Sequence, residues 1–451
     1  MKVLLIDPPH EAFLGYYRFY FPLGLVSVGS VLEADGHEVS IHDADHLPEG
    51  RCLANVDASR LFDAYFDGLQ QADHPLWKQV AEVVLEFAPE IVGITVLSCK
   101  VPSALRVAEI VRRLLPQAKI MLGGDHTVYF ARELAARPEV DAVVIGEGEE
   151  TARELVRAWQ QGSSLAQVKG IAYREGTQVL RTSRRRLIDD LDRLPLPNRS
   201  LLRGSDGYRA ADMGLMMTSR GCTAYCTFCG IASSLGRRGR MRSIANCLEE
   251  IRLTRERYGT DYFSFRDGTF TADRQRTLDF CDALIDAQLG VTWECLTRPD
   301  CLDEELIRRM QAAGCTQVRL GIESGSPRVL AYMRKETTID QCLRAAELLN
   351  AAGMYWSAYL LFGVPEETWE DIGLTLDLVE KMQPSFLTVS RYVPLPGTKM
   401  YEDVRLMGKS VDWQCQNNKC VDQSYSKHFS SERFQEIMQW LGEYAAEYNR
   451  R

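Results

Sequence analysis

Short apolar runs alternate with segments of helical apolar spacing along the first 165 residues of the chain. The apolar runs have the length of buried strands, and they fall at residues 2–8, 37–44, 90–97, 119–124 and 141–147. The segments with helical spacing fall at residues 23–36, 77–89, 103–116, 128–137 and 151–160. Strands that alternate with helices form parallel sheets. The pattern predicts an α/β domain over residues 1–165, with the five strand–helix units of a flavodoxin-like doubly wound sheet.

The loops that follow the predicted strands are the expected binding region of this domain. Ligands of doubly wound sheets bind beyond the carboxyl ends of the strands. These loops are residues 7–15, 97–102, 123–127 and 146–150. Residues 47–75 interrupt the alternation and are interpreted as an insertion.

A second series of strand and helix patterns starts near Met213. Six apolar runs in it are predicted to be strands, at residues 214–220, 261–267, 290–297, 317–324, 354–363 and 386–394. Six strand–helix units suggest a partial (β/α)6 barrel over residues 213–400, and barrel chemistry also lies at the carboxyl ends of strands. Residues 166–212 are predicted to form a linker with a short hairpin-like piece. Residues 401–451 are predicted to form a short, mostly helical C-terminal region.

The charge balance argues against a nucleic-acid partner. The chain carries 53 basic and 62 acidic residues, a net charge of −9, whereas non-specific nucleic-acid binding depends on neutralising phosphates. No stretch reaches the ~18 apolar residues of a membrane span. The apolar run near the N-terminus is only four residues long, Val3 to Ile6, and Asp7 ends it. It is therefore interpreted as a strand, not as a targeting segment. We therefore expect a cytoplasmic protein whose thirteen cysteines are reduced.

Three cysteines follow the first strand of the second series with the spacing C-x3-C-x2-C: Cys222, Cys226 and Cys229. A structural zinc site would need a fourth Cys or His ligand, but no histidine lies between His126 and His428. Thiolates also bind iron–sulfur clusters. A 4Fe–4S cluster on three cysteines keeps one iron open, which can bind a cosubstrate and pass it an electron. The spacing therefore favours such a cluster over zinc.

This motif and its neighbours resemble the radical S-adenosylmethionine (SAM) superfamily. In that family SAM chelates the open iron. One electron from the cluster then cleaves SAM to methionine and a 5′-deoxyadenosyl radical. Phe228, in the last cysteine spacer, matches the aromatic residue that packs beside the adenine. The motifs FSFRDGTFTAD, WECLTRPD and LGIESGSPRVLAYMRK also match. The resemblance implies that Asp267 meets the amino group of SAM, that Arg298 pairs with its carboxylate, and that Glu323 belongs to the SAM site.

The first domain is similar to the cobalamin-binding domain that precedes this barrel in one subgroup of the superfamily. The matching segments include GITVL, MLGGDHT and VVIGEGEETARELV. Glycines in them would let the bulky tail of the cofactor approach the backbone. The first loop has Asp7 and His10 but lacks the glycine of the D-x-H-x-x-G motif, so His10 is not assigned as a cobalt ligand; the lower cobalt face is expected to meet residues 98–100. The resemblance implies a cobalamin site formed by Thr95, Leu97, Ser98, Cys99, Gly123, Gly124, Gly146 and Glu147.

The resemblance as a whole implies a cobalamin-dependent radical-SAM enzyme. The commonest activity of the subgroup is methylation of an unactivated carbon of a small molecule, through methylcobalamin and a 5′-deoxyadenosyl radical. The electron donor would be a protein such as flavodoxin or ferredoxin. Residues 413–420 could line the substrate pocket, and Cys415 and Cys420 alone are too few for a second cluster.

Three alternatives stay open. The first is a non-methylating cyclisation, ring contraction or rearrangement on the same scaffold. The second is an RNA methylthiotransferase, which is disfavoured because the first domain has only Cys52 and Cys99. The third is a non-catalytic cobalamin or redox sensor, which would not need Asp267 or Arg298.

Overall fold

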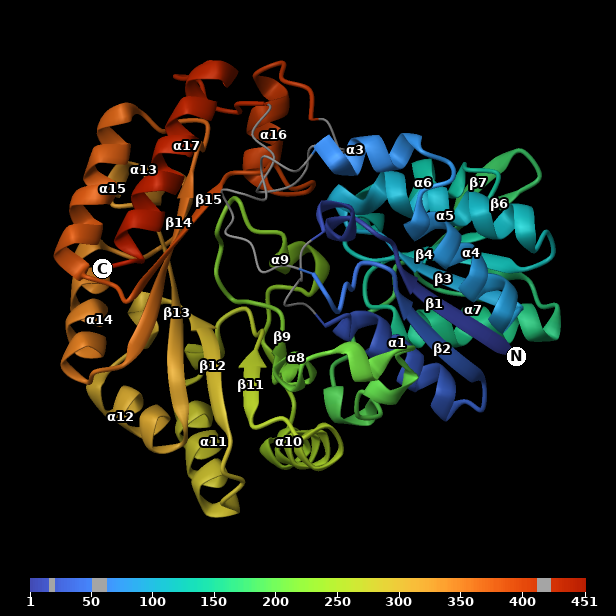
Figure 1. Cartoon of the computed structure of the whole chain (residues 1–451), viewed down its shortest axis with the longest axis horizontal. Helices are drawn as coiled ribbons and strands as arrows, with labels where there is room; N and C mark the ends of the chain where they lie inside the picture. The colour runs from blue at the N-terminus through green and yellow to red at the C-terminus, as the bar shows by residue number, and fades with distance from the viewer. Residues whose placement is uncertain (16–20, 51–62, 412–422) are drawn as a thin grey trace. The chain divides into compact units, whose positions relative to one another are not determined.

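The computed structural model describes residues 1–15, 21–50, 63–411 and 423–451. Two compact units divide the chain between Arg209 and Ala210. Each unit is built around its own sheet (Figure 1). Cys52, Cys415 and Cys420 lie outside the described residues.

The sheet of the first unit has seven strands in the order β2-β1-β3-β4-β5-β6-β7. The first five pair in parallel, and this 2-1-3-4-5 order is the flavodoxin-like order that the sequence pattern predicts. The two last strands add antiparallel pairs at one edge. The strands are β1 (Lys2–Asp7), β2 (Glu38–Asp43), β3 (Ile91–Thr95), β4 (Lys119–Gly123), β5 (Ala142–Val144), β6 (Ile171–Glu175) and β7 (Gln178–Arg181).

Helices connect the parallel strands of this sheet. Apolar side chains fill β1, β3 and β4 on both faces, as expected of parallel strands covered by helices. The helices are α1 (Leu23–Ala34), α3 (Asp63–Gln70), α4 (Pro75–Phe87), α5 (Val101–Leu114), α6 (Thr127–Ala135) and α7 (Glu149–Gln161). The short 3-10 helix η2 (Ser98–Lys100) follows β3.

The segment after α7 packs against the first unit. The hairpin expected there is the β6–β7 pair, which extends the sheet. Farther along, the Arg203 amide donates to Ile41 O at 2.8 Å, and Leu202 bridges to Ile41 beside the edge strand β2. Arg199 is buried. These contacts place the segment up to Arg209 in the first unit.

The sheet of the second unit has six strands in the order β15-β14-β13-β12-β11-β8, and every neighbouring pair is parallel. Strands in sequential order that pair in parallel form the partial barrel that the sequence predicts. A small antiparallel pair stands beside this sheet, formed by β9 (Ser219–Arg220) and β10 (Arg240–Met241). The six strands are β8 (Leu215–Met216), β11 (Tyr262–Phe265), β12 (Thr292–Thr297), β13 (Cys315–Glu323), β14 (Tyr355–Phe362) and β15 (Phe386–Arg391).

Polar caps start most of the helices that follow these strands. The Thr338 and Thr368 side chains each accept a backbone N–H at a helix start, in reciprocal capping boxes. Ser243, Asp273, Asp303 and Ser430 cap four further helices. The helices are α8 (Ala210–Met213), α9 (Ile231–Ser234), α10 (Ile244–Tyr258), α11 (Arg274–Ala287), α12 (Glu304–Ala312), α13 (Pro327–Tyr332), α14 (Ile339–Ala351), α15 (Trp369–Met382), α16 (Lys399–Leu406) and α17 (Ser431–Tyr448).

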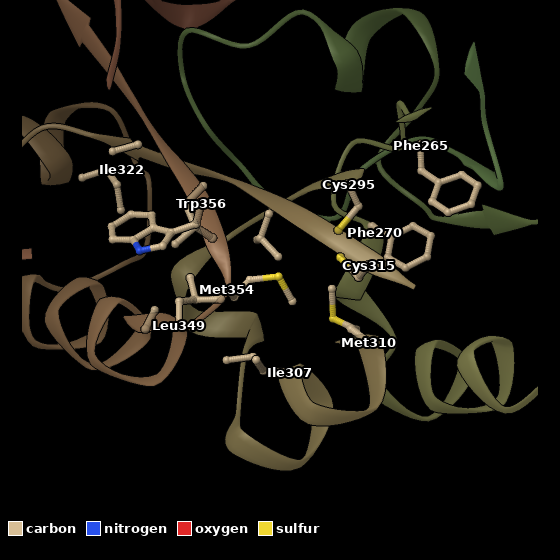
Figure 2. Packing of buried hydrophobic residues seen from close by; sticks show 14 of the residues in the cluster. Phe265, Phe270, Cys295, Ile307, Met310, Cys315, Ile322, Leu349, Met354 and Trp356 are labelled. Carbon is tan, nitrogen blue, oxygen red and sulfur yellow. The ribbon is translucent and has the colours of Figure 1, made fainter. Parts of the chain in front are cut away.

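The core of the second unit lies between one face of the sheet and these helices. Phe265, Cys295 and Trp356 of the strands belong to one cluster with Met310 and Leu349 of the helices, and Trp356 lies near Leu349 (Figure 2). Burying a side chain of this size contributes about 1.5–3 kcal/mol. The C-terminal helix α17 adds Ile437 and Leu441 to the same core, so it is part of this unit. In the described residues no helix is long and apolar enough to cross a membrane.

Candidate functional site

The three motif cysteines lie in the loop that follows β8, and this loop is framed by the β9–β10 pair. All three are free thiols and half-buried. They are close enough that the charges of Cys222 and Cys226 act on the pKa of Cys229, which burial raises to about 11. Thiols that are close together but protonated when bare are ready to bind a metal centre, which displaces their protons.

Tight backbone contacts fix the shape of this loop. Gly221 has φ +90°, and a Cβ there would lie 2.4 Å from Arg238 O. A Cβ at Gly268 would lie 3.1 Å from the Cβ of Cys222. The Thr227 amide donates to Met333 O at 2.8 Å, and its hydroxyl donates to Tyr332 O at 3.0 Å. The loop is therefore held by neighbouring segments on several sides.

Two cations flank Cys226. The Nη1 of Arg298, directly after β12, lies 3.9 Å from Cys226 Sγ. Burial raises the pKa of the Cys226 thiol, while Lys335 and Arg298 oppose the rise. The Arg298 guanidinium also donates to Lys335 O at 2.8 Å and to both carboxylate oxygens of Asp300, at 2.9 and 3.0 Å. Cations at this position favour a thiolate, the form that binds metal.

Glu323 contacts Lys335, which with Arg298 lies beside Cys226. Lys335 Nζ lies 2.9 Å from Glu323 Oε1, and the lysine is 5% exposed. Burial alone would lower the pKa of Lys335, but Glu323 and Cys226 outweigh it and raise the pKa. Glu323 ends β13 with φ +67°, next to an irregular register at Gly321. A left-handed backbone at a non-glycine residue is strained, and here it accompanies the pairing of the carboxylate with Lys335.

The Asp267 carboxylate contacts the segment just before the cysteine loop. It is 2% exposed. Its Oδ1 accepts from the Thr218 hydroxyl at 2.9 Å and the Ser219 hydroxyl at 2.5 Å, and its Oδ2 accepts from the Thr218 amide at 3.2 Å. Burial raises the pKa of Asp267, while these hydrogen bonds lower it. The carboxylate ties the end of β11 to the segment just before Cys222.

Phe228 packs among apolar side chains in the described part of the second unit. The ring lies against a cluster of Val329, Met333, Val364, Tyr392, Met400, Val404 and Tyr425. Val329 lies in α13, and Met333 follows the end of that helix. The ring therefore lies on the side of the loop that Thr227 holds to residues 332–333.

The carboxyl ends of β3 and β4 are side by side in the first unit. Thr95 and Gly123 are register partners. A Cβ at Gly123 would meet only Val144 Cβ, at 3.7 Å, and a Cβ at Gly146 would meet nothing within 4 Å. Gly124 has φ +118°, and a Cβ there would lie 2.8 Å from Val96 O, so the turn itself requires glycine. Gly146 has φ +85°, which also favours glycine, whereas Gly123 has no positive φ.

Polar side chains bridge the loops at this edge. Ser98 Oγ lies 3.0 Å from His126 Nδ1, which joins η2 to the loop after β4. The Cys99 carbonyl accepts from the Tyr65 hydroxyl at 3.3 Å. Glu147 Oε2 accepts from the Ile188 amide at 2.7 Å. Leu97 precedes η2 and is half-buried.

Lys100 is fully buried, and its Nζ pairs with Asp7 at 2.5 Å and with Asp45 at 2.9 Å. Both ion pairs occupy the Lys100 ammonium group. Of residues 98–100, Ser98 and Cys99 are therefore better candidates than Lys100 to face the lower side of cobalt. Asp45 also accepts from the amides of His10 and Ala12, at 2.7 and 2.8 Å. This buried group fixes the loops that follow β1, β2 and β3.

Comparison with known families identifies both units. Residues 216–379 match the radical SAM superfamily, and residues 16–156 match the B12-binding domain. An uncharacterized methyltransferase of Pyrococcus horikoshii is 30% identical over 445 residues, which cover 97% of this chain and 91% of the relative. The chain belongs to the cobalamin-dependent radical SAM enzymes. Cobalamin, SAM and a 4Fe–4S cluster are the cofactors of this family.

Other relatives of this radical SAM enzyme differ in their named reactions. An anaerobic magnesium-protoporphyrin IX monomethyl ester cyclase of Rubrivivax gelatinosus is 32% identical, covering 72% of this chain and 60% of the relative. A cytidylyl-2-hydroxyethylphosphonate methyltransferase of Streptomyces wedmorensis is 28% identical, covering 89% and 81%. The solved radical SAM methyltransferase TsrM from Kitasatospora setae has the same fold, with a TM-score of 0.74 and 20% identity over 90% of this chain and 75% of that one.

The structure brings two of the predicted SAM residues of this enzyme together at one lysine. Arg298 and Glu323 meet at Lys335 beside Cys226. Asp267 instead contacts Thr218 and Ser219.

Sequence reasoning missed three residues near the expected sites. Lys335 closes the motif that contains Glu323, and a buried lysine twelve residues after a motif carboxylate is not recognisable from spacing alone. Cys301 looks like one of the scattered cysteines, yet the charges of Cys222 and Arg298 act on its pKa, which burial and Asp300 raise to about 11. His126 directly follows the GGD turn, and that position beside a predicted binding loop was an available signal.

Proposed function

We propose that this chain methylates an unactivated carbon of a small molecule, with residues 1–165 binding cobalamin and residues 213–400 forming the radical-SAM barrel. The observation that carries the methylation is the match to a named methyltransferase along almost the whole chain. When bound, the cluster and SAM supply a hydrogen-abstracting radical, and cobalamin supplies the methyl group. The residues of this chain bind, orient and shield these groups.

Cys222, Cys226 and Cys229 would hold the 4Fe–4S cluster. Their support is chemical: three half-buried free thiols share one backbone-fixed loop, and thiolates are the ligands of such clusters. In the described residues no three His, Cys, Asp or Glu side chains are arranged to hold a single metal ion. A cluster differs from a single ion because its cysteines each bind a different iron, so they need not converge on one point.

The SAM site would be formed around Cys226. Arg298 would pair with the SAM carboxylate, because a guanidinium recognises a carboxylate through two parallel hydrogen bonds. Glu323 would also contact SAM, with its carboxylate held by Lys335. Phe228 would pack beside the adenine. Asp267 would act at the SAM amino group or, as its contacts with Thr218 and Ser219 support, by holding the cysteine loop in place.

The cobalamin site would lie at the carboxyl edge of the first sheet. Thr95 and Leu97 end or follow β3, while Ser98 and Cys99 begin the turn of η2. Gly123 and Gly146 leave room beside the backbone, which suits a bulky nucleotide tail. Gly124 and Glu147 would shape the loops that face it.

A cyclisation remains the second candidate. It is favoured by the 32% identity to a named cyclase, although that match covers only 72% of this chain. Such a reaction would use the same SAM site without transferring a methyl group. Both candidates need an electron donor, for which flavodoxin or ferredoxin is the natural choice. Reduced thiols and an oxygen-sensitive cluster suit the cytoplasm.

A substrate-free assay separates the two candidates. Anaerobically reconstituted protein is incubated with SAM and a reductant, with and without cobalamin. Methylation predicts S-adenosylhomocysteine that forms only when cobalamin is present, together with slow release of 5′-deoxyadenosine. If 5′-deoxyadenosine forms and S-adenosylhomocysteine does not, under any redox condition, the methyl-transfer assignment is wrong and the cyclisation is favoured.

A further inference from the structure

One face of the second sheet is polar, although its strands are buried. Successive side chains of a strand alternate between the two faces. Phe263 and Phe265 of β11, and Val318 and Leu320 of β13, belong to the hydrophobic core. The residues between them therefore face the other side, the inside of the partial barrel. On β11, β12, β13 and β14 these are Ser264, Glu294, Gln317, Arg319 and Ser357.

Two arginines and one glutamate meet on this inner face. Glu294 is 1% exposed. Its Oε2 lies 2.5 Å from Arg319 Nη2, and its Oε1 lies 3.6 Å from Nη2 of Arg266, the residue directly after β11. Ser264 donates to Glu294 Oε1 at 2.6 Å, and Arg319 Nη1 donates to the Tyr359 hydroxyl at 3.3 Å.

This group carries an unbalanced positive charge. Two guanidinium groups face one carboxylate, which leaves a net charge of about +1 if all three are ionised. Burial lowers the pKa of Arg266, and the nearby charge of Arg319 lowers it further. The Nε of Arg319 is buried without a hydrogen-bond partner. This atom is itself covered, so another anion would bind at the exposed parts of the two arginine side chains, which carry the excess charge.

The arginines point into the barrel just below the expected SAM site. Arg319 is the register partner of Leu296 in β12, and Arg298 follows Leu296 by two residues, directly after the strand. Two residues of a strand span about 7 Å. The side chains of Arg319 and Arg266 are still 21% and 31% exposed, so both remain accessible. A group bound there would lie next to the region where SAM reacts.

We propose that Arg266 and Arg319 bind an oxyanion of the substrate, a carboxylate or a phosphate-like group, inside the barrel. This inference rests on the proposed function, because it names the class of molecule that is methylated. Glu294 holds the two guanidinium groups apart and in place, and Tyr359 adds a hydroxyl beside Arg319. The substrate would be anchored by its charged end, with its reacting carbon directed toward the SAM site.

Equilibrium dialysis of the holoenzyme with radiolabelled inorganic phosphate, and separately with acetate, tests this proposal. We expect saturable binding of at least one of the two anions. Arg266→Gln should weaken it at least about tenfold, since a charge-assisted hydrogen bond is lost. Arg319→Lys keeps a cation beside Glu294 but removes the planar fork, and should weaken it as well. Preference for phosphate or for acetate then identifies the kind of anion.

Arg274→Gln is the matched control, because Arg274 is an exposed arginine that pairs with Asp303 and Glu305 on the surface. It should bind the anions as the wild type does. Cluster absorbance shows whether each variant is folded. Equal binding by wild type, Arg266→Gln and Arg319→Lys, or no binding of either anion, would overturn the proposal. The proposed function fails separately, if wild-type holoenzyme does not cleave SAM.

Discussion

The guanidinium of Arg298 lies 3.9 Å from the sulfur of Cys226, and the same guanidinium donates to the carbonyl of Lys335. The cysteine proposed to bind the cluster and the arginine proposed to bind the SAM carboxylate therefore share one location. Replacing Arg298 with Met should leave the cluster in place but raise the SAM concentration needed for half-maximal cleavage by at least about tenfold, because a charge-assisted pair is lost. The measurement is 5′-deoxyadenosine formation against SAM concentration, with iron content determined on the same samples. Arg309→Met, at an exposed arginine that pairs with Asp282, should behave as the wild type.

The Lys335–Glu323 pair should stabilise the barrel unit. Lys335→Met leaves the Glu323 carboxylate without its buried partner, and the free energy of unfolding should fall by about 3 kcal/mol or more. Glu323→Gln should cost less, because an amide can still accept a hydrogen bond from Lys335. Anaerobic denaturant unfolding of both single variants and the double variant measures the coupling. Additive effects of the two substitutions would show that the pair does not act as a unit.

Asp267 should control whether the cysteine loop is ordered for iron. Asp267→Ala removes the acceptor for the Thr218 and Ser219 donors, so reconstituted iron content should drop clearly below the wild-type value. Ser219→Ala removes one of these hydrogen bonds and should give a smaller loss. A protein with full iron content but no SAM cleavage in Asp267→Ala would instead assign the carboxylate to SAM itself.

The two neighbouring glycines at the end of β4 should respond differently to substitution. A side chain at Gly123 would meet little of the surrounding protein, so Gly123→Val should fold. The valine would occupy the space proposed for cobalamin, and the variant should no longer bind it. Gly124→Ala forces a Cβ toward Val96 O at φ +118°, and should destabilise the first unit by about 1–3 kcal/mol. Gel filtration with hydroxocobalamin, together with thermal unfolding, distinguishes the two effects. Undiminished pigment in Gly123→Val would remove that glycine from the site.

His126 should make the stability of the first unit sensitive to acid. Burial lowers the pKa of His126 from 6.5 to about 4. Between these two pH values the histidine is protonated in the unfolded chain but not in the folded chain. The free energy of unfolding should therefore fall as the pH drops from 6.5 to about 4, by up to about 3 kcal/mol. His42, whose pKa burial and Arg203 also lower to about 4, acts in the same direction. His126→Gln should flatten part of this dependence in denaturant unfolding at several pH values, and an unchanged slope would contradict the assignment.

Strand patterns alone could predict both sheets, because parallel strands covered by helices are continuous apolar runs. The run at residues 261–267 and the run at 354–363 contain β11 and β14. The small β9–β10 pair could not be predicted, since two-residue strands have no periodicity. The hairpin of β6 and β7 was recognisable, but its addition to the first sheet depends on long-range pairing.

The site was predictable only where a motif fixes it. The spacing singles out Cys222, Cys226 and Cys229, and the structure places all three in one loop; that they hold a cluster stays a prediction. That Asp267 meets SAM stays a prediction. Its hydrogen bonds with Thr218 and Ser219 could not be predicted, because the direction of a buried carboxylate depends on the donors that surround it. Lys335 and Cys301 come close to the cysteine loop through the folding of β12, β13 and their following segments, which no local pattern reveals.

The central claim is that three cysteines hold the cluster and leave one iron for SAM. Cys301 is the decisive control, since it lies near Cys222 but is assigned no iron. Iron content and electron paramagnetic resonance of anaerobically reconstituted protein should show about four irons in the wild type and in Cys301→Ala, with a spectrum that changes when SAM is added. Cys222→Ala, Cys226→Ala and Cys229→Ala should each lose the cluster. Loss of the cluster in Cys301→Ala, or stoichiometric zinc without iron absorbance in the wild type, would contradict the account.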